Sequence, residues 1–182
     1  MSTNKHSPLG KGYVQVYTGN GKGKTTAALG LAFRAAGYGL KTYIGQFMKG
    51  RKYSELDAAK MMPDFITIEQ YGKEEFTYTK DPPDPENLRI AKTGLANAKK
   101  AMLSRKYNIV ILDEINTAQF FHLITVAEML ELIQNKPDGV ELIFTGRYAP
   151  QELLDVADLV TEMVERKHYF NKNVPSRNGI EQ

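Results

Sequence analysis

Short apolar runs alternate along this chain with longer segments in which apolar residues recur every three or four positions. The runs have the length of strands, and the longer segments have the periodicity of helices with one buried face. One run, Asn108–Leu112, is continuously apolar, as a strand buried on both faces of a parallel sheet requires. The alternation predicts one α/β domain, with a mostly parallel sheet of about six strands and helices on both faces. The predicted strands lie at 13–17, 41–47, 65–70, 108–112, 140–145 and 159–164, and the predicted helices start near 27 and span 54–62, 85–106, 124–134 and 151–157.

The stretch Tyr17–Thr26 stands between the first strand and the first helix and is rich in glycine. Glycines in such a turn let backbone N–H groups point inward at phosphate oxygens, and the following helix adds its free N–H groups. Lys24 offers a cation to the phosphates, and the hydroxyl of Thr25 suits a Mg²⁺ ion. The sequence therefore predicts a phosphate-loop (RecA-like) nucleotide-binding fold. The residues assigned to ATP in this stretch are Gly19, Asn20, Gly21, Lys22, Gly23, Lys24, Thr25 and Thr26.

The spacing of this loop is irregular. A usual phosphate loop has four residues between its first glycine and Gly-Lys-Thr, and here that first position is Thr18, while Gly19 is one residue too close. The loop is either shortened by one residue or carries threonine at its first position. A glycine-rich turn that binds nothing is the alternative interpretation.

Three further segments follow predicted strands, where parallel α/β sheets hold their ligands. The basic segment Met48–Lys52 contains three cations that suit phosphates or carboxylates, although a solvated charge cluster fits it equally well. The pair Asp113 and Glu114 resembles the carboxylates that approach Mg²⁺ in phosphate-loop proteins. The long loop 71–84 contains Phe76 and Tyr78, which either cover a flat ligand or pack on the core. Ser54 is expected to cap the helix that follows the basic segment.

Composition narrows the function classes only slightly. The chain has 182 residues, a net charge of +3 and no cysteine, so it has no disulfide, thiolate zinc site or cysteine nucleophile. The mild charge does not indicate a nucleic-acid partner, and no apolar run approaches the length of a membrane span. We expect one domain over 1–182 in the cytoplasm, with residues 1–11 disordered and 166–182 forming a C-terminal tail.

Several motifs together resemble the phosphate-loop family of ATP:corrinoid adenosyltransferases. They run in order over nearly the whole chain, and the short phosphate loop is itself the form found in that family. This combination is far more specific than the phosphate loop alone. The matching segments are Thr18–Thr26, Gln46–Gly50, Phe76–Tyr78, Leu112–Glu114, Thr145–Arg147 and Lys167–Phe170.

The resemblance implies that the cobalt of a Co(I) corrinoid attacks the ribose 5′-carbon of ATP and that triphosphate leaves. It implies that Thr25 and Glu114 hold Mg²⁺ and that Lys24 stabilises the leaving group. Arg147 is expected near the nucleotide, and Phe76 with Tyr78 below the corrin ring. We also assign Lys49 to the corrinoid. The expected partners are ATP, a corrinoid, an electron donor such as a reduced flavoprotein, and a second copy in a homodimer, with no nucleic acid and no membrane.

Two other functions fit the same fold, because fold does not determine function. One is an ATP hydrolase or kinase, in which Glu114 beside Asp113 would orient a water molecule at the γ-phosphate. A binding module would hold ATP and corrinoid without turnover. The chain also departs from the family at Tyr78, where relatives commonly have tryptophan, and at Glu75, where they commonly have glycine.

Overall fold

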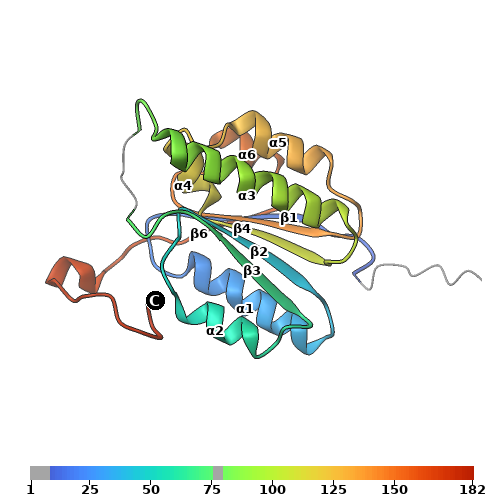
Figure 1. The fold of residues 1–182 in the computed structure, drawn as a ribbon, viewed down its shortest axis with the longest axis horizontal. Helices are drawn as coiled ribbons and strands as arrows, with labels where there is room; N and C mark the ends of the chain where they lie inside the picture. Colours follow the sequence, from blue (N-terminus) through green and yellow to red (C-terminus); the bar gives the residue numbers. More distant parts are fainter. Residues whose placement is uncertain (1–8, 76–79) are drawn as a thin grey trace, which may run out of the picture.

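The computed structural model describes residues 9–75 and 80–182, and in these ranges one sheet is covered by helices on both faces (Figure 1). Helices α1 and α2 lie on one face, and α3, α4, α5 and α6 lie on the other. The strands are β1 (Val14–Thr18), β2 (Thr42–Phe47), β3 (Ile66–Tyr71), β4 (Ile109–Asp113), β5 (Glu141–Thr145) and β6 (Leu159–Glu162). The helices are α1 (Lys24–Gly37), α2 (Ser54–Lys60), α3 (Pro85–Leu103), α4 (Ile115–Phe120), α5 (Val126–Gln134), α6 (Gln151–Val156) and the 3₁₀ helix η1 (Tyr169–Lys172).

The six described strands form one sheet in the order β3-β2-β4-β5-β1-β6, and every pairing in it is parallel. This confirms the predicted α/β class. Chain order alone did not predict the strand order. Because all strands run the same way, their carboxyl ends meet at one edge of the sheet, and the loops after β1, β2, β4 and β5 become neighbours.

Three local expectations need correction. Helix α4 directly follows the acidic pair, where no helix was expected, and a 3₁₀ turn stands in the tail at Tyr169–Lys172. Ser54 is the first residue of α2 and not its cap, since Tyr53 occupies the N-cap position without a side-chain hydrogen bond. The Ser54 hydroxyl donates instead to the carbonyl of Gln182, so its environment depends on the far end of the chain.

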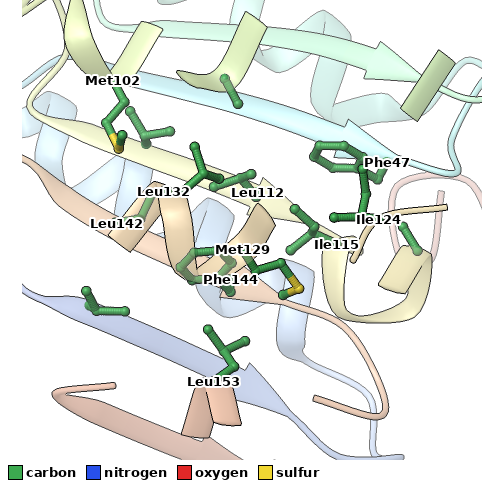
Figure 2. Packing of buried hydrophobic residues seen from close by; sticks show 14 of the residues in the cluster. Phe47, Met102, Leu112, Ile115, Ile124, Met129, Leu132, Leu142, Phe144 and Leu153 are labelled. Carbon is green, nitrogen blue, oxygen red and sulfur yellow. The ribbon is translucent and has the colours of Figure 1, made fainter. Parts of the chain in front are cut away.

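Two apolar clusters pack the helices against the sheet, one on each face. Strand β4 serves both, because its successive side chains point to opposite faces: Val110 and Leu112 to one cluster, Ile109 and Ile111 to the other. Figure 2 shows the larger cluster, to which α3, α5 and α6 contribute Met102, Met129 and Leu153.

Among the described residues, no helix is both long and apolar enough to cross a membrane.

Helix α3 lies very close to β3. It begins at Pro85 as predicted, and the Asp84 carboxylate caps it by accepting from the Asn87 N–H at 2.8 Å. Further along, an added Cβ at Gly94 would stand 2.5 Å from the Tyr71 ring. The hydroxyl of Tyr71 in turn accepts from the Asn97 amide at 3.0 Å. Only glycine at position 94 lets helix and strand approach this closely.

We expect Gly94→Ala to lower the free energy of unfolding by about 1–3 kcal/mol, because the new methyl group must displace a packed ring. Gly30→Ala in α1 is the matched control, since nothing lies within 4 Å of its added Cβ and alanine is the better helix former. Urea unfolding of both variants measures the difference. Equal stability of the two variants would contradict the close contact between α3 and β3.

Candidate active site

The glycine-rich loop occupies residues 19–23, between the last residue of β1 and the first of α1. Thr18 still belongs to the strand, so the loop itself is short. Gly19 and Gly23 have φ values of 94° and 125°, which favour glycine. The Gly21 N–H donates to the carbonyl of Met163 at 2.7 Å, which fixes the loop against the segment after β6.

Lys24 folds back over this loop. Its ammonium donates to the carbonyls of Gly19 and Gly21, both at 2.8 Å, and the residue is only 7% exposed. Burial lowers the pKa of Lys24, with a further contribution from Arg147, while the carboxylates of Glu114 and Asp113 act in the opposite direction. A cation that is poorly solvated and only partly compensated by acidic groups is well suited to receive an anionic ligand.

Asp113 ends β4 and is the most completely bonded side chain of the site. Its Oδ1 accepts from the hydroxyls of Thr25 at 2.8 Å and Thr145 at 2.7 Å. Its Oδ2 accepts from the ammonium of Lys49 at 2.8 Å and from the Gln46 amide at 3.3 Å. Burial alone would raise the pKa of Asp113, but the Lys49 cation and these hydrogen bonds hold that pKa below its ordinary value. Asp113 is therefore a charged group whose lone pairs are already in use.

Glu114 differs from its neighbour. Glu114 has left-handed backbone geometry, with φ at 61°, directly before α4, and the residue borders the cavity described below. Burial and the adjacent Asp113 carboxylate raise the pKa of Glu114, although its Oε2 accepts a hydrogen bond from Thr117. A carboxylate left under like-charge repulsion at the edge of a cavity is a group that a divalent cation would stabilise.

A cavity of about 750 Å³ opens beside these groups at the carboxyl edge of the sheet. Six of the eight residues assigned to ATP in the loop border it, as do Lys49, Glu114 and Arg147; Gly19 and Asn20 do not. Phe76 and Tyr78 lie outside the described residues. The lining also includes groups that we did not assign from the sequence, namely Tyr53, Glu55, Thr117, Phe120, Phe121, Tyr148, His168 and Gly179–Gln182.

The cations around the cavity are not equally free. The ammonium of Lys49 is held by Asp113 and lies 3.6 Å from Glu55, so its predicted contact with a corrinoid stays a prediction. Lys22 donates to the carbonyl of Ile180 at 3.2 Å. Arg147 is exposed, and its backbone N–H donates to the Thr117 hydroxyl at 3.2 Å, which ties the loop after β5 to α4.

Aromatic side chains form another part of the lining. The rings of Phe120 and Tyr148 lie 4.2 Å apart between centroids, and the ammonium of Lys80 lies 3.9 Å from the centre of the Phe120 ring. Tyr148 keeps a left-handed backbone, with φ at 61°, and 48% of its surface is exposed. These rings offer an apolar surface to a flat ligand. They escaped prediction because Phe120 lies on the unpredicted helix α4.

Mg²⁺ fits the groups at this edge. Thr25 and Glu114 both border the cavity, and a hydroxyl and a carboxylate are the hard oxygen ligands that Mg²⁺ takes. In the described part of the chain, no three His, Asp or Glu side chains are clustered as a metal site. Asp113, whose oxygens are occupied, orients Thr25.

An all-parallel sheet with a glycine-rich loop between β1 and α1, and acidic residues at the end of β4, defines a phosphate-loop-like α/β protein. The comparisons give the family. A family model described as ATP:corrinoid adenosyltransferase BtuR/CobO/CobP matches residues 10–182. This chain belongs to that family.

Curated relatives agree. A corrinoid adenosyltransferase of Sinorhizobium sp. is 36% identical over 176 residues, covering 94% of this chain and 80% of that protein. The corrinoid adenosyltransferase of Escherichia coli K12 is 30% identical, covering 94% and 86%. Corrinoid adenosyltransferase CobA of Salmonella typhimurium is 31% identical, with the same two shares. The predicted family is thus confirmed.

The two carboxylates should respond differently to removal of their charge. In the ligand-free protein, Asp113→Asn should lower the free energy of unfolding by about 3 kcal/mol, because it removes the buried negative charge that pairs with the Lys49 ammonium. Glu114→Gln should leave the melting temperature unchanged or raise it, because it removes like-charge repulsion. Thermal melts without nucleotide measure both. If Glu114→Gln loses more stability than Asp113→Asn, then Glu114 is the structural carboxylate and Asp113 is the one open to a ligand.

Proposed function

We propose that this chain transfers the 5′-deoxyadenosyl group of ATP to the cobalt of a Co(I) corrinoid and releases triphosphate. Family membership supports the reaction, and the single structural observation that carries it is the cavity. It brings the phosphate-binding loop, Glu114 directly after β4 and an aromatic surface together in one space. A phosphate site alone would serve many enzymes, and the aromatic surface beside it offers a place for a second, flat substrate.

In this reaction the electron pair of cobalt forms the Co–C bond while the C5′–O bond breaks, and the departing triphosphate takes the electron pair of that bond. The nucleophile comes from the corrinoid substrate, so the chain needs no activated side chain. Its tasks are to hold two reactants in line and to stabilise the charge that develops on the leaving group. Lys24 and the N–H groups of the loop perform the second task.

Mg²⁺, when bound, would neutralise charge on the phosphates. Thr25 and Glu114 would hold it, with Asp113 fixing the Thr25 hydroxyl. Arg147 borders the same cavity and supplies another positive charge on the nucleotide side. Lys49 keeps Asp113 ionised, so its effect on the metal site acts through that carboxylate.

Three further assignments are untested: a homodimer and a reduced flavoprotein as electron donor, which come from the resemblance, and a cytoplasmic location, which comes from the composition of the chain. They stay predictions. An ATP hydrolase or kinase is not favoured by the comparisons.

Analysis of the reaction products tests the proposal. The protein is incubated with ATP, Mg²⁺ and chemically reduced corrinoid, and the Co–C bond is followed by absorbance while the phosphate products are separated. Intact triphosphate in equal amount to adenosylated corrinoid supports transfer. Release of ADP and phosphate without Co–C bond formation would establish the hydrolase.

We expect Lys24→Ala to lower the rate of adenosyl transfer by at least about a hundredfold, which is the effect of losing one donor to developing charge. Arg34→Ala is a suitable control, because this basic residue lies in the last turn of the same helix and does not border the cavity. Turnover at saturating ATP measures both. Turnover of Lys24→Ala close to that of the unmodified protein would exclude Lys24 from the chemical step.

Phe76 and Tyr78 are two residues apart, so in an extended segment they would point to the same side. We expect the double alanine variant to bind ATP normally but to lose most activity when the corrinoid starts as Co(II). It should retain much more activity with Co(I), since covering the lower face assists reduction only. Turnover from the two oxidation states is compared, with ATP affinity measured alongside. Equal losses of turnover from Co(II) and Co(I) would indicate that the two aromatic residues position the corrinoid and do not assist its reduction.

A further inference from the structure

The C-terminal end of the chain returns to the nucleotide side of the cavity. Residues Gly179–Gln182 border it together with the phosphate loop and the start of α2. In Figure 1 the red end of the chain leaves the sheet after β6, turns at η1 and comes back toward α1 and α2. We call residues 177–182 the C-terminal strap.

Two side chains from distant segments anchor this strap. From the phosphate loop, the Lys22 ammonium donates to the carbonyl of Ile180 at 3.2 Å and lies 3.8 Å from the Glu181 carboxylate. From the first turn of α2, the Ser54 hydroxyl donates to the carbonyl of Gln182 at 3.0 Å. The strap therefore joins the phosphate loop to α2 across one side of the cavity.

The strap also has an internal structure of its own. The guanidinium of Arg177 donates to both oxygens of Glu181, at 3.1 and 3.0 Å, and the Tyr169 hydroxyl donates to the same carboxylate. The Glu181 N–H closes a turn on the Arg177 carbonyl at 3.0 Å. Hydrogen bonds from Arg177 and Tyr169 lower the pKa of Glu181 to about 2, so it is ionised and paired at neutral pH. The strap is preorganised, and Lys22 binds a formed structure.

We propose that the C-terminal strap is one wall of the ATP-binding site and that Lys22 is a positioning residue, which holds this wall and does not bind phosphate itself. The inference rests on the proposed function only for the identity of the nucleotide. A wall that is already ordered narrows the cavity and keeps water from the phosphates, and ATP then binds without the cost of ordering the segment. Lys24 remains the cation of the loop that meets the phosphates.

A double-mutant cycle tests this, with Mg²⁺-ATP affinity measured by titration calorimetry in the absence of corrinoid. The variants are Lys22→Met, the chain ending at Asn178, and the two changes combined. Each single change should weaken ATP binding about three- to tenfold, as expected for losing one or two hydrogen bonds. The combined variant should be no weaker than the truncated chain, because Lys22 then has no strap to hold.

Control variants, a kinetic measurement and melting temperatures accompany the cycle. Lys60→Met removes an exposed lysine that pairs with Asp57 and does not border the cavity, so it should leave ATP affinity unchanged. Lys22→Arg should retain most of the affinity, because a guanidinium also donates to the Ile180 carbonyl. In adenosyl transfer, the truncated chain should show a raised KM for ATP and an unchanged kcat. Melting temperatures identify any variant that is unfolded, and Ser54→Ala then tests the strap through its other anchor.

Two results would overturn the inference. If Lys22→Met weakens binding by the same factor in the full and truncated chains, Lys22 contacts the phosphates directly. If truncation leaves the affinity unchanged or increases it, the strap is not a wall of the site. Both results come from ATP affinities alone, without corrinoid. The product analysis tests the proposed reaction separately, so a failure of the inference and a failure of the proposed reaction can be told apart.

Discussion

One buried carboxylate holds the active-site edge of this protein together. Asp113 accepts hydrogen bonds from α1, β5 and β2 and from the lysine that follows β2. Removing such a group from water is unfavourable unless each oxygen is bonded and an opposite charge lies close by. Both conditions are met, so α1, β2 and β5, which are distant in the sequence, are fixed to the end of β4 at one point. The position of the Thr25 hydroxyl follows from this arrangement.

The adjacent carboxylate gains its chemical role from the same arrangement. The ammonium of Lys49 and the hydroxyls of Thr25 and Thr145 donate to Asp113, whereas the Glu114 carboxylate accepts a hydrogen bond from the Thr117 hydroxyl. It remains next to a like charge and borders the cavity. Two neighbouring acidic residues thus differ in function because one is fully bonded and the other is open to a ligand.

Family membership and local geometry answer different questions here. The family indicates the reaction, while the geometry indicates how each cation is used. Of the lysines near the cavity, Lys24 at the start of α1 donates to the loop carbonyls, Lys49 neutralises Asp113, and Lys22 holds the C-terminal strap. Three residues with the same charge therefore have three different tasks, which a motif alone does not distinguish.

The sequence by itself determined the α/β class, the phosphate loop and the family, because these depend on local periodicity and on contiguous motifs. Helix α4 escaped prediction, since its six residues are too few for a periodic signal, and Ser54 was misassigned because its partner is Gln182 at the end of the chain. Only the tertiary structure decided the strand order, the partners of Asp113, the aromatic surface at Phe120 and Tyr148, and the path of the strap. Each of these depends on contacts between residues far apart in the chain, which the pattern of neighbouring residues does not encode.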